Sequence, residues 1–267
     1  MKKSDIEHST KVDVDSTTSE HSGLKGLLET ILRRFRTATF MIALFPVYLL
    51  AVLIMAISAT PAVYFFNFMQ EFSATFSAPL NYFFIALALI GGFFIYGFSL
   101  IFVAPFFNLI IPIKMKPFRG PYYSLRSVPW FVHNTILYVV RYTFLEFITP
   151  TPLNILFYRM MGMKIGKGVH LNTTNISDAA LIELEDKVTI GGSVHIICHY
   201  AAKGFLVIAP VKIRKGATLG LKATVMGDVE IGENAVIAPH EVVYPKSRVA
   251  ADHKPAKAKS INGLSLE

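Results

Sequence analysis

Aliphatic side chains recur every six residues between residues 213 and 249. This register holds Ile213, Leu219, Val225, Ile231, Ile237, Val243 and Val249, and the small or slender residues four positions after the first four are Ala217, Ala223, Val229 and Ala235. A helix repeats its inward face about every 3.6 residues and a strand every 2, so a period of six fits neither. It predicts short strands joined by corners, three of which make one coil of a parallel β-helix.

The repeat carries a set of related motifs. They read Ile-Gly-Lys-Gly-Val-His at 165–170, Val-Thr-Ile-Gly-Gly at 188–192, Leu-Gly-Leu-Lys-Ala at 219–223 and Ile-Gly-Glu-Asn-Ala at 231–235. With them the chain resembles the hexapeptide-repeat acyltransferases, whose fold is an all-β left-handed parallel β-helix. The runs Met-Gly-Met-Lys-Ile-Gly, Thr-Thr-Asn-Ile-Ser-Asp and Cys-His-Tyr look most like the membrane-bound carboxy-terminal region of ε-poly-lysine synthetase-like proteins. The resemblance covers about residues 150–250 and is more specific for fold than for reaction.

The composition indicates a protein that meets a membrane. A mean hydropathy of +0.48 with 16% charged residues is unusual for a soluble protein. The net charge of +8 comes without a basic repeat, a zinc-ligand spacing or a base-stacking motif, so it favours an anionic membrane surface over nucleic acid. The single cysteine, Cys198, excludes an internal disulfide framework and fits a reducing compartment.

Two apolar stretches, at about 40–66 and 82–113, predict a transmembrane hairpin. Glu71 is the only charged residue from 37 to 113, and each stretch exceeds the roughly 20 residues that cross a bilayer core. Prolines are expected to kink or end these helices: Pro46, Pro61, Pro105 and Pro112.

Basic residues flank the hairpin on one side. Arg33, Arg34 and Arg36 precede it and Lys114, Lys116 and Arg119 follow it, whereas the turn at 67–81 has no lysine or arginine. The positive-inside rule therefore predicts a multi-pass protein of the cytoplasmic (inner) membrane with both ends in the cytoplasm. The β-helix would then lie on the side where coenzyme A thioesters are made.

The segment 128–148 has two interpretations. It is apolar enough for a third span, but Arg141, Glu146, His133 and Asn134 lie within it, and a charge at mid-bilayer costs about 2.5–3.5 kcal/mol. We favour an interfacial helix with the aromatic side chains Trp130, Tyr138 and Tyr142 at headgroup depth. A spanning segment would instead place the β-helix outside.

These features divide the chain into four parts. Residues 1–22 have almost no large apolar side chains and predict a disordered tail, with no signal peptide before the first span. A membrane domain follows at 23–160, including a connector at 149–160 whose prolines stop the preceding helix and in which 153–161 predicts a short cap on the open end of the β-helix. The acyltransferase β-helix occupies 161–250, and 251–267 forms a C-terminal tail.

The register is imperfect between 165 and 207, with its largest interruption at 198–206. His199 opens this loop. In the family that the chain resembles, a histidine just before the protruding loop is the general base that deprotonates the acceptor. An unperturbed pKa near 6.5 suits imidazole to that role. The alternative is a loop histidine that is solvated or bonded to backbone.

Other site candidates depend on the same resemblance. Asn175 and Asp178 match a stretch that approaches the cleft in relatives, so either would bind the acceptor or orient His199, the alternative being turn chemistry. His195 would line the groove with the acceptor. Two departures from the family pattern weaken any transfer of substrate, and Cys198 has no feature that marks it as a nucleophile. The departures are Glu185, where glycine is common, and Ala180, where an acidic residue is usual.

The resemblance implies acetyl-CoA or another acyl-CoA as donor, lying between subunits of a homotrimer. Gly220, Lys222 and Ala238 are the candidate cofactor residues, because small residues admit the pantetheine and a lysine can meet phosphate; the alternative is that Gly220 and Ala238 serve only the coil corners. No metal is expected: His170, His195 and His199 supply ligand types, but not the spacing of β-helical carbonic anhydrases.

The sequence thus predicts a membrane-anchored acyltransferase acting on a hydroxyl or amine of an envelope precursor, lipid or saccharide. Two other functions stay open. The likeness to poly-lysine synthetase suggests transfer of an aminoacyl group from a carrier protein to an amine. A non-catalytic trimeric scaffold at the membrane is the third.

Overall fold

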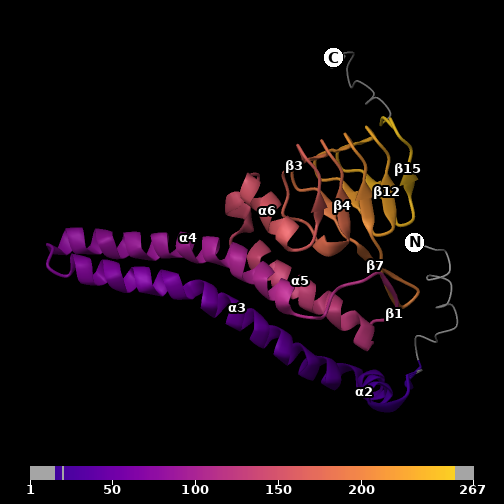
Figure 1. The fold of residues 1–267 in the computed structure, drawn as a ribbon, viewed down its shortest axis with the longest axis horizontal. Helices are drawn as coiled ribbons and strands as arrows, with labels where there is room; N and C mark the ends of the chain where they lie inside the picture. Colours follow the sequence, from indigo (N-terminus) through magenta and orange to yellow (C-terminus); the bar gives the residue numbers. More distant parts are fainter. Residues whose placement is uncertain (1–15, 20, 256–267) are drawn as a thin grey trace.

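The computed structural model describes residues 16–19 and 21–255, and it consists of a long helical part followed by a coil of short strands (Figure 1). Most of the two predicted tails, 1–22 and 251–267, lies outside these residues. The helical part forms a hairpin, and the strands stack at one end of it (Figure 1).

Three helices open the described chain: α2 (Gly23–Arg34), α3 (Arg36–Ser73) and α4 (Ala78–Ile110). Helices α3 and α4 run side by side and contact one another along the hairpin (Figure 1). Leu44–Ser73 and Ala78–Ile110 are long and apolar enough to cross a membrane. Large apolar side chains on both face outward, among them Phe45 (70% exposed) and Leu109 (70%).

The helix bounds differ from the predicted 40–66 and 82–113. Helix α3 continues through Asn67 and Glu71, so the predicted turn at 67–81 shrinks to 74–77. The side-chain amide of Asn81 closes this turn by donating to the carbonyl of Ser73 at 2.7 Å. Helix α4 ends at Ile110 because Pro112 disfavours a helical conformation at Ile111, which is extended (φ −66°, ψ 122°).

Three of the four prolines lie inside continuous helices instead of ending them: Pro46, Pro61 and Pro105. A proline removes one backbone donor and strains one turn, which is tolerated where neighbouring groups satisfy the freed carbonyl. Only Pro112 ends a helix.

The segment predicted as one helix at 128–148 is shorter in the structure. After strand β1 (Phe118–Pro121) and a 3₁₀ turn at Leu125–Ser127, helix α5 covers Val128–Arg141, and a second 3₁₀ turn follows at Leu145–Ile148. Fourteen helical residues extend about 21 Å, less than the roughly 30 Å of a bilayer core. Helix α5 contacts α3 and α4, and its other side faces the strands (Figure 1).

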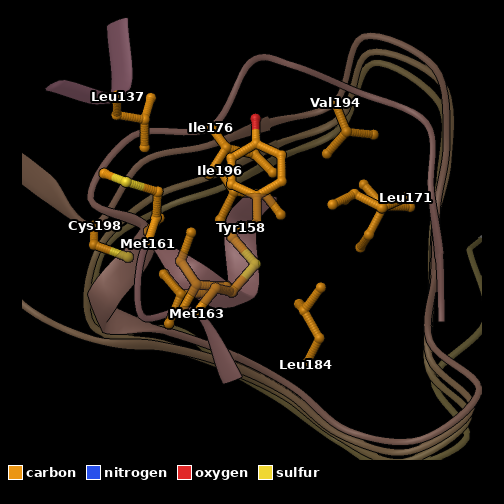
Figure 2. Packing of buried hydrophobic residues seen from close by; sticks show 14 of the residues in the cluster. Leu137, Tyr158, Met161, Met163, Leu171, Ile176, Leu184, Val194, Ile196 and Cys198 are labelled. Atoms are coloured by element: carbon orange, nitrogen blue, oxygen red, sulfur yellow. The ribbon is translucent and has the colours of Figure 1, made fainter. Parts of the chain in front are cut away.

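A short helix, α6 (Pro152–Met160), closes the first coil. Thr151 caps it by accepting a hydrogen bond from the backbone N–H of Leu153 at 3.2 Å, with Pro152 in the first turn. Tyr158 is fully buried inside the coil near Ile176 and Ile196 (Figure 2). Its hydroxyl donates to the carbonyl of Thr174 at 3.3 Å, so α6 is the cap that the sequence predicted at 153–161.

The strands form three parallel sheets that the chain visits in turn, which is the topology of a parallel β-helix. In spatial order, the first sheet is β13 (Val236–Ile237), β10 (Thr218–Leu219), β5 (Thr189–Ile190) and β3 (His170–Leu171). The second is β14 (Val242–Val243), β11 (Thr224–Val225) and β6 (His195–Ile196). The third is β15 (Arg248–Val249), β12 (Val229–Ile231), β9 (Val211–Ile213), β4 (Ile182–Leu184) and β2 (Lys164–Ile165).

The six-residue register is the interior of this β-helix. Thr218 lies opposite Val236, eighteen residues further on, so one coil consumes three hexapeptides. Of the register residues, Ile213, Leu219, Val225, Ile231 and Ile237 are fully buried, as are Ala217, Ala223 and Ala235. The interior aliphatic positions that the sequence predicted are confirmed.

The predicted interruption at 198–206 is a β-hairpin of β7 (His199–Ala202) and β8 (Phe205–Ile208). It lengthens its coil, because Thr189 lies opposite Thr218, twenty-nine residues further on. Strand β1 pairs antiparallel with β8, placing Phe118 opposite Ile208, and Ile208 opposite His199 on β7. Strand β1, which follows α4 in the chain, therefore holds the β7–β8 hairpin in place.

Candidate functional site

Asp178 and His199 meet where the coil is interrupted. An isolated parallel pairing sets Ile176 beside Ile196 on the next coil, and it brings Asp178, two residues on, next to Cys198. Nδ1 of His199 lies 2.6 Å from Oδ2 of Asp178. Stacking of consecutive coils thus brings together two side chains that stand 21 positions apart in the chain.

The carboxylate of Asp178 is fully buried and fully hydrogen-bonded. Oδ2 accepts from His199 and from the backbone N–H of Cys198 at 3.0 Å. Oδ1 accepts from the indole N–H of Trp130 at 2.8 Å and from the side-chain amide of Asn134 at 2.7 Å. Four donors match the acceptor capacity of an ionised carboxylate.

His199 begins strand β7, and 23% of its side chain is exposed. The edge of the Trp130 ring packs on it, with centroids 4.9 Å apart and planes 72° apart. Because Asp178 holds Nδ1, Nε2 is the ring nitrogen that is able to accept a proton from a substrate. A carboxylate in this position fixes the tautomer and orientation of the imidazole and stabilises its protonated form.

Helix α5 supplies a row of polar side chains to the loop 174–178. Trp130, Asn134, Tyr138 and Arg141 follow the spacing of one helix face. Beyond the two bonds to Asp178, the Tyr138 hydroxyl lies 2.8 Å from Oγ of Ser177, and Arg141 donates to the side chain of Asn175. Trp130 and Tyr138, which the sequence predicts at headgroup depth, both make hydrogen bonds to the β-helix.

The opposite side of α5 joins the site to the hairpin. Nδ1 of His133 lies 3.0 Å from Oδ1 of Asn108 on α4. Burial lowers the pKa of His133 to about 4, against a smaller opposing effect of the Asp178 charge. His133 is therefore neutral near pH 7 and acts as a structural contact.

The candidate substrate residues have different surroundings. Asp178 is fully buried, so it reaches a substrate only through His199, and the geometry favours orientation over acceptor binding. The side chain of Asn175 is held by Arg141. His195 lies on β6 with its side chain largely exposed. Its pKa is lowered, chiefly because part of the ring is desolvated and to a lesser extent because Arg141 is positively charged. His170 belongs to another sheet, so the three histidines weighed as metal ligands do not share one face.

The two residues that depart from the family pattern have structural roles. Glu185 forms an ion pair with Arg214 on the next coil, at 2.6 Å, which a glycine could not make. Ala180 packs beside Gly162. A Cβ added to Gly162 would lie only 3.2 Å from the Cβ of Ala180.

The candidate cofactor residues lie at a different corner from His199. Gly220 and Lys222 stand between β10 and β11, and Ala238 stands between β13 and β14, whereas His199 follows β6. A Cβ on Gly220 would lie 2.6 Å from the backbone nitrogen of Pro239, so stacking of the coils itself requires glycine there. The backbone N–H of Ala238 donates to Glu241 at 2.8 Å. Within one chain these residues are not brought to His199.

Cys198 is fully buried beside the site. Burial, followed by the negative charge of Asp178, raises the pKa of its thiol well above the ordinary value of 9.0. The backbone of Cys198 contributes the hydrogen bond to Asp178, while its sulfur belongs to the interior of the coil (Figure 2).

Sequence reasoning missed Trp130 and Asn134 as site residues. Asn134 is one of the polar residues of the apolar segment and Trp130 was interpreted as an interfacial aromatic residue, but their partner Asp178 lies 44 or more positions away, outside any local motif. The signal that was present is their spacing of four residues, which repeats at Tyr138.

Comparison with known proteins gives a consistent set of relatives, although no family model matches the chain. Delta-poly-L-ornithine synthetase of Acinetobacter baumannii (strain AB307-0294) is 21% identical over 170 residues, which are 62% of this chain. The chain spans only 12% of the length of that protein.

The comparison with solved structures matches several acetyltransferases, each with a low TM-score. Serine acetyltransferases of Brucella abortus strain S19 and Neisseria gonorrhoeae are 13% and 15% identical, with TM-scores of 0.30 and 0.29; the matches cover 72% and 74% of this chain and 93% and 84% of those chains. A hexapeptide-repeat acetyltransferase of Vibrio cholerae O1 biovar eltor, solved with acetyl-coenzyme A, is 12% identical over 40% of this chain and 79% of its own, with a TM-score of 0.27. In its six-residue register and its three parallel sheets, the chain resembles the hexapeptide-repeat acyltransferases.

Proposed function

We propose that this protein is a membrane-anchored acyltransferase in which His199 is the general base. The observation that carries the proposal is the buried Asp178 carboxylate at 2.6 Å from Nδ1 of a partly exposed imidazole. This pair sits on a hexapeptide-repeat coil, at the place where the repeat is interrupted. A histidine so oriented is suited to deprotonating a hydroxyl or an amine.

In the proposed reaction, Nε2 of His199 takes the proton of the acceptor as its oxygen or nitrogen attacks the thioester carbonyl. The negative charge that develops on the carbonyl oxygen is stabilised by backbone N–H groups of the cleft. Collapse of the tetrahedral intermediate breaks the carbon–sulfur bond, and the leaving thiolate recovers the proton from His199. The products are an ester or amide of the acceptor and a free thiol.

The proposed donor is acetyl-CoA or another acyl-CoA, bound between subunits of a homotrimer of left-handed coils. Gly220, Lys222 and Ala238 stand at one corner of the β-helix and His199 at another. An assembly around a threefold axis apposes different corners of neighbouring chains, so one subunit would supply the base and the next would hold the cofactor. This arrangement accounts for cofactor candidates that are remote from His199 in the single chain.

The proposed location is the inner membrane, with the β-helix in the cytoplasm. The support is the large exposed apolar surface of α3 and α4, which water would not tolerate, and the basic residues that follow α4. Anchoring favours an acceptor that is itself at the membrane, such as a lipid, a lipid-linked saccharide or an envelope precursor.

One observation favours a second candidate, the transfer of an aminoacyl group from a carrier protein to an amine. The curated relative is named as a synthetase of poly-ornithine, and it matches 62% of this chain. The same imidazole would then deprotonate an amine, and the thioester would belong to a carrier-bound pantetheine instead of coenzyme A.

The test is thermal stability and calorimetry of the detergent-solubilised protein with coenzyme A and acetyl-CoA. A ligand that binds only the folded state stabilises it by mass action and therefore raises the melting temperature. At a ligand concentration of a hundred times Kd, the free energy of unfolding rises by about 2.7 kcal/mol. Wild type is compared with His199→Ala and with His170→Ala, which removes an exposed histidine on another sheet.

We expect saturable binding by all three proteins and loss of acyl transfer only in His199→Ala. Absence of binding at millimolar ligand would contradict the coenzyme A proposal and favour the carrier-protein donor. Normal cellular function of His199→Ala would contradict both enzymatic proposals and favour a scaffold.

A further inference from the structure

We infer that Trp130 and Asn134 are positioning residues for the Asp178–His199 pair, so that helix α5, which lies outside the β-helix, forms part of the catalytic centre. The inference rests on the proposed function of His199 as base. The inference goes beyond that function because it assigns a role in catalysis to α5, the helix that lies between the α3–α4 hairpin and the β-helix.

The division of labour between the two carboxylate oxygens supports this assignment. Oδ1 of Asp178 is bonded to α5 alone, through Trp130 at 2.8 Å and Asn134 at 2.7 Å. Oδ2 is bonded to the β-helix alone, through Cys198 and His199. With Oδ1 anchored on α5, the carboxylate cannot rotate about its bond to Cβ, and Oδ2 stays aimed at the imidazole.

Asn134 also holds the backbone of Asp178. Its side-chain oxygen accepts from the backbone N–H of Asp178 at 3.0 Å, while its nitrogen donates to the carboxylate. Asp178 has a left-handed conformation (φ 61°, ψ 38°), which residues other than glycine adopt uncommonly. One buried amide, 5% exposed, therefore fixes both the main chain and the side chain of Asp178.

Trp130 acts on both members of the pair. Its indole N–H donates to Asp178, and the edge of its ring packs on the imidazole with centroids 4.9 Å apart. Trp130 thus holds the carboxylate by a hydrogen bond and blocks the imidazole sterically, which limits the rotation of His199 about its own side-chain bonds. Misplacement of a base by about 1 Å is enough to cost on the order of a hundredfold in rate.

The donors from α5 also decide how strongly His199 holds its proton. Trp130 and Asn134 share the negative charge of the buried carboxylate, and removing one concentrates the charge on His199, which then releases its proton less readily. The other titratable groups near Asp178 are His133 and Tyr138 on α5 and the thiol of Cys198 on the β-helix. None of these three carries a positive charge near pH 7, and the positive charge of Arg141, which contacts Asn175 on the same loop, is kept in every variant compared.

The experiment compares Asn134→Ala and Trp130→Phe with a matched control. Trp130→Phe removes the N–H donor and makes the side chain smaller, but it keeps an aromatic ring beside His199. Tyr138→Phe is the control, because it removes a 2.8 Å hydrogen bond between the same helix and the same loop, but one that goes to Ser177. Size-exclusion elution and the melting temperature in detergent report folding for all variants.

The first readout is acyl-transfer kinetics of the full-length protein. We expect kcat to fall about a hundredfold in Asn134→Ala and about tenfold in Trp130→Phe, with KM for acyl-CoA within twofold of wild type. The acidic limb of the pH profile should move to higher pH in both, and Tyr138→Phe should match wild type. Equal losses in Tyr138→Phe and Asn134→Ala would overturn the inference, because they would indicate a structural role alone.

The second readout needs no substrate. Diethylpyrocarbonate reacts with neutral imidazole, and peptide mass spectrometry of the modified protein follows His199 alone as a function of pH. We expect half-maximal modification of His199 at higher pH in Asn134→Ala than in wild type and Tyr138→Phe. Identical curves would overturn the inference; a shifted curve in a protein with no acyl transfer would instead contradict the proposed function and leave the positioning intact.

Discussion

Oδ2 of Asp178 lies 2.6 Å from Nδ1 of His199, and the aspartate that makes this contact is wholly buried. The pair is formed by two consecutive coils, whose backbones are held in register by the parallel pairing of Ile176 with Ile196. Its geometry therefore depends on the stacking of the β-helix, and its environment depends on helix α5.

Replacing Asp178 by asparagine should abolish most activity and also lower the melting temperature, because the amide nitrogen would face hydrogen-bond donors where a carboxylate oxygen accepted. Asparagine tolerates the left-handed conformation at this position, but an amide cannot stabilise a protonated imidazole. We expect kcat to fall by about 10²–10⁴ with little change in acyl-CoA binding, measured by initial rates and calorimetry. Activity within tenfold of wild type would exclude Asp178 as the partner of the base.

The contact between Gly97 and Phe144 should make one glycine of α4 irreplaceable. A Cβ on Gly97 would lie 2.1 Å from Cδ2 of Phe144, which is itself buried. We expect Gly97→Ala to lose about 1–3 kcal/mol of stability, seen as a lower melting temperature in detergent.

Gly92→Ala, on the same helix, is the control for that substitution. Its Cβ would lie 3.7 Å from Ala62, an ordinary contact, and alanine favours a helix over glycine by about 1 kcal/mol. We expect its melting temperature to equal or exceed that of wild type. A similar loss in both variants would indicate that Phe144 does not dock on α4 as described.

The ion pair of Glu185 should contribute stability that depends on pH. Arg214 lies 2.6 Å from Glu185 and 2.5 Å from Glu230, and so links three adjacent coils. The hydrogen bond from Arg214 holds the pKa of Glu185 below its ordinary value of 4.5. A depressed pKa adds stability above the unfolded-state value of about 4.3, and this stability is lost as the pH falls through the folded-state value.

Glu185→Gln should therefore be less stable than wild type at pH 7, by about 0.5–1 kcal/mol because the pair is partly exposed. The difference should vanish once the pH falls below the depressed folded-state pKa, where the wild-type carboxyl is also neutral. Denaturant titration at both pH values measures it. A difference that persists in acid would mean that packing, and not charge, accounts for the loss.

Cys198 should resist alkylation until the protein unfolds. Its sulfur is buried and its pKa is raised by burial, so little thiolate is available to react. Mass spectrometry after iodoacetamide treatment should show no adduct in native protein and one adduct in denaturant, since the chain has one cysteine. Cys198→Ala, which keeps the backbone N–H to Asp178, should retain activity; its inactivity would make the thiol a catalytic group.

The β-helix was predictable because its inward positions recur at a fixed interval. Ile213, Leu219 and Val225 each end a strand of a different sheet, so a purely local count of residues reads the fold directly. The helix ends were less predictable. Asn67 and Glu71 look like turn residues, but α3 continues through them, and the turn lies further on, where Asn81 contacts Ser73.

The candidate site was likewise predictable only in part. His199 and Asp178 were predicted as candidates because they stand at an interruption of the repeat and in a recognisable motif. Their pairing required the coils to be stacked, and Trp130 and Asn134 required a helix from outside the repeat to be docked. Such contacts join residues 44 or more positions apart, and no local pattern encodes them.

Helix α6 also gives the β-helix a direction of assembly. Because Pro152–Met160 precedes β2, the first strand of the β-helix, the ribosome delivers this capping helix before any coil exists. The first coil can close at once around Tyr158, and every later coil meets a finished edge on which to pair (Figure 2). At each moment of synthesis the nascent coils would expose a single growing edge, which limits the opportunity for pairing between unfinished chains.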